Sequence, residues 1–336
     1  MLTIPKLFNE DGGDGFHDQA LVGGNPTGIA NLNNVRYTWA VTTYNTMLNN
    51  FWRPQKINLT EDKLSVATLT KEEDEALKDT LSFLIFLDNY QVNNLPNIAE
   101  YITCPAVKHV LTVQAFQEVI HSETYQYVLE ALYPSFERDQ IYNRWRDNEA
   151  LFKRNKALAD IAQRFKDSPD DEAFDDVLLA NYCLEGIYFY QGFNFFDQLA
   201  HRGKLVGTGA EIDYIRVDEK VHIGIFANII KERGIPVEKI HKAIRSACLN
   251  EIEWCINTYG NKIIGITTGS SERYIKWLGN DRCARLGVPP VFDEVENPYT
   301  YLESATGVGM KRKNFFESGG VVEYDTADSV PGWDEL

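Results

Sequence analysis

The chain has 336 residues, of which 44% are apolar, and its formal net charge at pH 7 is -16. This length predicts one large domain or two average ones, with enough apolar material for a packed core. The negative charge argues against a nucleic-acid-binding protein, because no basic field would attract phosphate groups. No run of about 18 uncharged apolar residues predicts a membrane-spanning helix. The N-terminus also lacks the basic and apolar regions of a signal peptide.

The five cysteines stand at positions 104, 183, 248, 255 and 283. Their number is odd and no two of them form a CxxC pair. This pattern is typical of a reduced protein with neither a disulfide framework nor a zinc site. We therefore expect a cytoplasmic location.

Three segments differ in composition. Residues 1–35 are polar and glycine-rich, which predicts a flexible N-terminal arm. Residues 36–300 carry apolar side chains at helical spacing, which predicts one all-α domain. Residues 301–336 are predicted to form a flexible tail that is acidic from residue 317 onward. The tail ends with Trp333 and Leu336, which suit either a frayed terminus or a peptide that docks on a partner.

Two helix starts are marked in the sequence. Thr70 and Glu73 have the spacing of a capping box and precede a long apolar run. Pro236 is suited to the first turn of a later helix.

Carboxylates interrupt four apolar stripes of helical spacing. A carboxylate on such a stripe is costly to bury unless it is paired or bound to a metal. In the second and fourth stripes a histidine follows the glutamate by three positions, which is about one helical turn. In chain order the stripes consist of Leu77, Leu81, Leu84, Ile85 and Asp88; Glu118, His121, Tyr125, Val128 and Leu132; Leu178, Tyr182, Glu185, Phe189, Phe193 and Phe196; and Ile212, Ile215, Glu219, His222, Phe226 and Ile229.

The order carboxylate, Glu-x-x-His, carboxylate, Glu-x-x-His predicts a ferritin-like helical bundle with a dinuclear metal site in its four-helix core. Carboxylate oxygens can bridge two metal ions, and they suit iron or manganese. A third Glu-x-x-His, at Glu238 and His241, follows Pro236 directly and has no carboxylate helix at a matching interval. We interpret this third motif as structural.

The interrupted stripes and several short segments resemble a known family. The segments are FWRP (51–54), FLDN (86–89), QEVIHSETY (117–125), LEGIYFYQGF (184–193), DEKVH (218–222) and NFFESGGVVEY (314–324). They are similar in kind and order to those of the small, radical-generating beta subunit of class I ribonucleotide reductase. The resemblance implies that the metal ligands are Asp88, Glu118, His121, Glu185, Glu219 and His222.

The resemblance also implies a radical site. Tyr125 occupies the place of the family's radical tyrosine, seven residues after Glu118. Helical geometry agrees with this assignment, because a phenol one turn beyond His121 points to the same interior as the metals. The residues that match the apolar pocket around this tyrosine are Phe189, Phe193 and Ile215.

In the family, the oxidising equivalent travels from the core to the large subunit. The residues that match this relay are Trp52, Asp218 and Tyr324, with the ligand His121 connecting the metals to the first two. The end of the chain, with Trp333 and Leu336, matches in position the tail that docks on the large subunit.

These expectations define one function and two alternatives. The chain would be the small subunit of ribonucleoside-diphosphate reductase, a homodimer that acts only with a large (alpha) subunit and binds neither nucleic acid nor membranes. The resemblance favours two iron ions per chain. Mn/Mn and Mn/Fe pairs stay open, and manganese would imply a flavodoxin-like activator. The alternatives are a stand-alone dimetal-carboxylate oxidase or acyl desaturase on the same fold, and a ferritin-type iron store.

Overall fold

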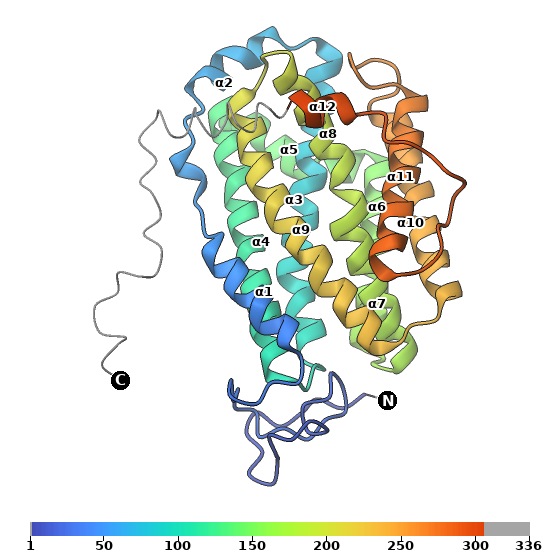
Figure 1. The fold of residues 1–336 in the computed structure, drawn as a ribbon. Helices are drawn as coiled ribbons and strands as arrows, with labels where there is room; N and C mark the ends of the chain where they lie inside the picture. Colours follow the sequence, from blue (N-terminus) through green and yellow to red (C-terminus); the bar gives the residue numbers. More distant parts are fainter. Residues whose placement is uncertain (1, 306–336) are drawn as a thin grey trace. The chain divides into compact units, whose positions relative to one another are not determined.

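Helix α3 begins directly after Thr70, as the capping-box spacing predicts (Figure 1). The Thr70 hydroxyl accepts a hydrogen bond from the Glu73 amide at 3.1 Å, and the Glu73 carboxylate accepts one from the Thr70 amide at 3.0 Å. Helix α10 begins at Val237, so that Pro236 is its N-cap and lies one residue before the first turn. Both predicted helix starts are therefore confirmed to within one residue.

The computed structural model describes residues 2–305, and this part of the chain contains helices and loops but no strand. The prediction of an all-α fold is confirmed. The α-helices of the main unit are α1 (Thr38–Asn49), α2 (Thr60–Ser65), α3 (Lys71–Ala99), α4 (Pro105–Leu132), α5 (Ser135–Asp147), α6 (Glu149–Asp167), α7 (Asp171–Cys183), α8 (Tyr190–His201), α9 (Val206–Arg233), α10 (Val237–Thr258) and α11 (Thr268–Leu286). Two short 3₁₀ turns are formed by Pro54–Lys56 and Val66–Thr68.

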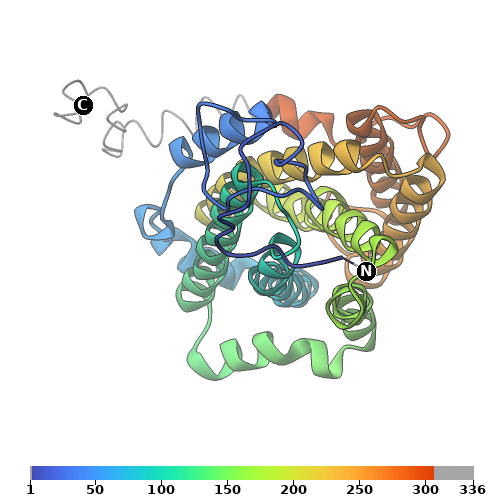
Figure 2. The same cartoon turned by 90° about the horizontal axis from the view of Figure 1, so that it is seen from below.

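Four helical segments close into a ring around the core. Helix α3 packs along α4, α4 packs on α9, α9 packs on α7 and α8, and α7 returns to α3. Figure 2 shows the bundle from below, with α1 beside α4 and α9. Helices α10 and α11 pack on each other and against the α7 side of the ring. The interior of the ring is where the four interrupted stripes meet.

The third stripe departs from the single regular helix that its spacing predicts. A π-helical turn, Leu184–Tyr188, separates α7 from α8. All five of its residues are buried. Such π turns are rare and are frequently found at functional sites.

The N-terminal arm has hydrogen bonds to the helical part of the chain. The Thr103 amide donates to the Leu21 carbonyl at 2.8 Å, and the Leu21 amide donates to the Tyr37 hydroxyl at 3.0 Å. The first helix begins at Thr38, which agrees with an arm that ends near residue 35. The flexibility of the arm stays a prediction.

Residues 299–336 form a separate unit. Within it the structure describes only residues 299–305, which include α12 (Thr300–Ala305). The predictions for Tyr324, Trp333 and Leu336 lie outside the described residues. Across residues 2–305, no helix has both the length and the apolar character needed to cross a membrane.

Candidate metal centre

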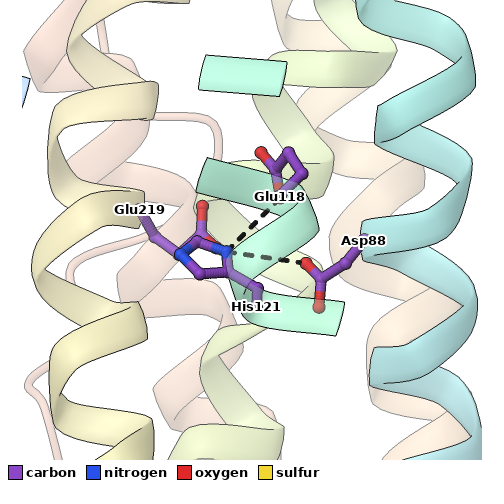
Figure 3. A group of neighbouring side chains, drawn as sticks. All are labelled: Asp88, Glu118, His121 and Glu219. Carbon is purple, nitrogen blue, oxygen red and sulfur yellow. Dashed lines mark ion pairs between the residues drawn. The ribbon is translucent and has the colours of Figure 1, made fainter. Parts of the chain in front are cut away.

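The core holds the six side chains predicted to bind metal, and all of them have zero solvent exposure. They form two groups whose ligand atoms lie within 4.8 Å of one another, and the two groups share Glu118 and Glu219. Figure 3 shows how three helices supply the first group. By element, the six are Asp88 from α3, Glu118 and His121 from α4, Glu185 from the π turn, and Glu219 and His222 from α9.

In the first group the carboxylates gather around Nδ1 of His121. This atom lies 3.2 Å from Oε1 of Glu219, 3.4 Å from Oε2 of Glu118 and 3.9 Å from Oδ1 of Asp88. In Figure 3 these side chains converge on one point between α3, α4 and α9.

In the second group the carboxylates gather around Nδ1 of His222. This atom lies 2.9 Å from Oε2 of Glu219, 3.3 Å from Oε1 of Glu118 and 3.7 Å from Oε2 of Glu185. Glu118 and Glu219 thus present one oxygen to each group. This is the arrangement needed to bridge two ions.

The unpaired atoms of the two groups fit a pair of cations. Both oxygens of Asp88 and of Glu118, Nδ1 of His121, Oε2 of Glu185 and Oε1 of Glu219 are buried without a hydrogen-bond partner among the described residues. Buried polar atoms are normally hydrogen-bonded, so a cluster of exceptions requires an explanation. Two divalent cations would satisfy these atoms, and their four positive charges would balance the four carboxylates.

The pKa values of the carboxyl groups in the two groups reflect the same lack of partners. Burial, followed by the charge of Glu118, raises the pKa of Asp88 well above its usual value. Burial, followed by the charge of Glu219, does the same to the pKa of Glu185. Burial would also raise the pKa of Glu219, but His222 and His121 hold it below its usual range.

The surrounding acids favour the charged form of both histidines. Burial would lower the pKa of His121, but the contacts with the Asp218 and Glu118 carboxylates raise it well above its usual value. Burial would likewise lower the pKa of His222, but the charges of Glu219 and Glu118 raise it. The site therefore holds protons where a metal would otherwise supply positive charge.

Three amides hold one oxygen of Glu185, and the sequence analysis did not single them out. Oε1 accepts hydrogen bonds from the amides of Gln91, Gln114 at 2.8 Å and Asn181 at 3.4 Å. Only Oε2 is left to face His222. Each amide lies three or four positions along the chain from a candidate ligand, but this spacing alone does not show that the amide is buried.

Tyr125 lies in the same interior. It has no solvent exposure, and its hydroxyl has no hydrogen-bond partner among the described residues. Burial and then the charge of Asp88 raise the pKa of this phenol well above its usual value. Phe189 and Phe193 stack with their ring centroids 5.7 Å apart, and Ile215 is fully buried one turn before Glu219.

A line of contacts leads outward from His121. Its Nε2 atom lies 3.2 Å from Oδ2 of Asp218, and the same oxygen accepts a hydrogen bond from the indole nitrogen of Trp52 at 2.8 Å. Trp52 is 6% exposed, so the line reaches close to the surface. The ring of Tyr214 stacks on Trp52 at 5.2 Å. Tyr214 precedes Asp218 by four residues. This spacing could have predicted the contact, but the sequence analysis missed it.

The third Glu-x-x-His lies apart from these groups. Neither group contains Glu238 or His241. Glu238 is exposed, and Nε2 of His241 lies 2.8 Å from the carbonyl of Pro289. These contacts agree with a structural role.

Comparison with known proteins identifies the family. Residues 29–298 match the family described as "Ribonucleotide reductase, small chain". The chain belongs to this family. It is 38% identical to the ribonucleoside-diphosphate reductase subunit beta of Treponema pallidum, over 95% of this chain and 94% of that protein. It is 33% identical to the protein of the same name from Halalkalibacterium halodurans, over 94% of each chain.

Solved structures agree with the family assignment. The R2 subunit of ribonucleotide reductase from Clostridium botulinum superposes with a TM-score of 0.87 at 39% identity, covering 90% of this chain and 98% of that one. The predictions of a class I ribonucleotide reductase small subunit and of a ferritin-like fold are confirmed. The predicted assignment to ribonucleoside-diphosphate reductase is also confirmed.

Proposed function

We propose that this small chain generates and stores a tyrosyl radical at Tyr125 and passes its oxidising equivalent to a large subunit, which reduces ribonucleotides to deoxyribonucleotides. The observation that carries the proposal is the cluster of unpaired, fully buried ligand atoms described above. The ligands would be Asp88, Glu118, His121, Glu185, Glu219 and His222, and they would hold two iron ions per chain. Mn/Mn and Mn/Fe pairs are the alternatives.

When bound and activated by an oxygen-derived oxidant, the metal pair would supply the one-electron oxidant for the phenol. Residues of the chain would enclose the phenol and tune its surroundings. Tyr125 is enclosed away from water, so its oxidised form would be protected from reaction with solvent. Phe189, Phe193 and Ile215 would form its apolar wall. Asp88 is the acidic ligand whose charge acts most strongly on the phenol.

The proposed route out of the core uses His121, Asp218 and Trp52. The hydrogen-bond distances that join Nε2 of His121, Oδ2 of Asp218 and the indole nitrogen of Trp52 support it. A proton held at Nε2 of His121 and the proton on the indole nitrogen both point at the same carboxylate. Proton positions along this line can therefore adjust as an electron moves. Tyr324 would continue the route in the tail.

The proposal also covers partners and location. The chain would form a homodimer and act only with the large subunit, on which the tail with Trp333 and Leu336 would dock. A manganese-loaded form would require a flavodoxin-like activator. The five buried free thiols suit a cytoplasmic location.

The decisive experiment combines metal analysis with electron paramagnetic resonance. The protein is measured as purified and again after loading with ferrous iron and air. We expect two irons per chain and a tyrosyl doublet that disappears in Tyr125→Phe while the iron content is unchanged. A metal-centred signal with no tyrosyl doublet would overturn the radical assignment and make Tyr125 an auxiliary residue. A protein that binds no metal would overturn the whole proposal.

A further inference from the structure

Gln117 lies between the relay carboxylate and the second histidine. It belongs to α4, directly before Glu118, and it is 5% exposed. Its side-chain nitrogen donates a hydrogen bond to Oδ1 of Asp218 at 3.1 Å. Its side-chain oxygen lies 3.0 Å from Nε2 of His222. The amide thus joins the carboxylate of Asp218 to the imidazole of His222.

The donor and acceptor roles along this bridge are fixed by chemistry. A primary amide can donate only from nitrogen and accept only at oxygen. Reversing the amide would set its oxygen against an oxygen of Asp218, with no donor between them. The amide oxygen therefore faces His222, and Nε2 of His222 must carry a proton to make the contact. Nδ1 is then the nitrogen left for a metal, and it is the atom that faces Glu118, Glu185 and Glu219.

His121 has the same orientation, but it contacts Asp218 directly, without an amide between them. Its Nε2 atom lies 3.2 Å from Oδ2 of Asp218, and its Nδ1 atom faces the carboxylates of the first group. Both imidazoles therefore direct Nε2 toward Asp218 and Nδ1 toward the metal groups. The contact is direct at one oxygen of Asp218 and passes through an amide at the other.

We propose that Gln117 is a positioning residue that anchors His222 to Asp218, so that one carboxylate orients a histidine of each metal group. A metal-bound histidine usually donates its other ring N–H to an acceptor, which fixes the tautomer and the ring orientation. Here Nε2 of His222 donates to the amide oxygen of Gln117, and the amide nitrogen of Gln117 donates in turn to Asp218. The inference rests on the proposed function, because it assumes that both groups bind metal.

The test isolates each group in the full-length chain. His121→Ala leaves only the group that contains His222, and His222→Ala leaves only the group that contains His121. Each background is combined with Gln117→Met, which keeps the size of the side chain and removes both hydrogen-bonding groups. Binding of Mn²⁺ alone is measured from the resonance of the free ion, and circular dichroism checks the helix content of each variant.

We expect Gln117→Met to weaken Mn²⁺ binding about 10- to 100-fold in the His121→Ala background. Affinity in the His222→Ala background should stay close to that of the parent. Gln191→Met is the matched control, because Gln191 is another buried glutamine whose amide donates to Ser271 at 3.3 Å.

Two results would overturn the inference. One is an equal loss of affinity in both backgrounds, which would mean that Gln117→Met damages the bundle in general. The other is a Gln117→Met variant that behaves like Gln191→Met. Either result leaves the proposed function intact if the parent protein binds two ions per chain. Failure of the parent to bind Mn²⁺ or iron would instead remove the proposed function itself.

Discussion

Glu211 offers a quantitative test of the electrostatics of the core. It lies on α9 about two turns before Glu219, it is fully buried, and neither of its carboxylate oxygens has a hydrogen-bond partner among the described residues. Burial, followed by the charge of Asp62, raises the pKa of Glu211 to about 9. Asp62 itself accepts hydrogen bonds from the Gly207 amide at 3.0 Å and the Thr208 hydroxyl at 2.7 Å. In the folded protein Glu211 is therefore protonated at neutral pH.

The direction of the pH effect follows from the raised pKa. In the unfolded chain the carboxyl ionises near its ordinary value of 4.5, whereas in the folded chain it ionises near 9. The folded state binds this proton more tightly, so stability is fully retained below pH 4.5 and is lost as the pH rises toward 9. Each pH unit in this window costs about 1.4 kcal/mol. At pH 7 the accumulated loss is roughly 3 kcal/mol.

Glu211→Gln removes this loss, because the amide keeps the shape of the side chain and does not ionise. The free energy of unfolding is measured by urea titration with circular dichroism at a series of pH values. Relative to wild type, the variant should gain about 3 kcal/mol between pH 5 and pH 7. Glu232→Gln, at an exposed position on the same helix, controls for the loss of one acidic group. Wild-type and Glu211→Gln curves that stay parallel across this range would refute the reasoning.

The remaining predictions concern the proposed function. Tyr125→Phe should keep the metal content and lose the tyrosyl resonance, whereas loss of both would argue for a structural role. Trp52→Phe removes the hydrogen bond to Asp218, so the radical should persist while turnover with the large subunit falls to background; normal turnover would contradict the relay. Deletion of residues 317–336 should abolish complementation by the large subunit and leave metal loading intact, as iron analysis would check. Because cations must displace protons from Asp88 and His121, Mn²⁺ affinity measured by titration should rise with pH, and a flat profile would contradict the pKa directions.

Helical periodicity was sufficient to predict the fold and to bring the candidate ligands together. Each candidate ligand occupies a position of an apolar stripe, and the stripes face the interior of the ring of helices. A carboxylate on such a stripe is informative because burial without a partner would destabilise the chain. The spacing within each Glu-x-x-His pair then puts both side chains on one face of one helix.

The π turn at Glu185 could not be predicted in the same way. Residues 177–189 are buried, so no polar face reveals where the helix changes its hydrogen-bonding pattern. The intervals from Leu178 to Glu185 and from Glu185 to Phe189 fit a regular α-helix equally well. Tertiary packing, rather than local sequence, decides the backbone at this point.

The amides that donate to Glu185 could not be predicted from the sequence either, for a different reason. Glutamine and asparagine are common on exposed helix faces, so a single one carries little information about burial. Gln91 follows Asp88 by three positions, and Gln114 precedes Glu118 by four. Their significance appears only when helices α3 and α4 are placed beside the π turn, where both side chains reach the same oxygen of Glu185.

The charges of the core explain how one bundle can hold so many buried ionisable groups. Without metal, the raised pKa values of Asp88 and Glu185 favour the protonated acids, and the raised pKa values of the histidines favour the charge that balances Glu118 and Glu219. With two divalent cations present, the acids would ionise, the imidazoles would become neutral and the site would again be balanced. Cations would thus take the place of protons at the same site. The Gln114 amide already holds one oxygen of Glu185 in this structure, so this candidate ligand is oriented before any metal arrives.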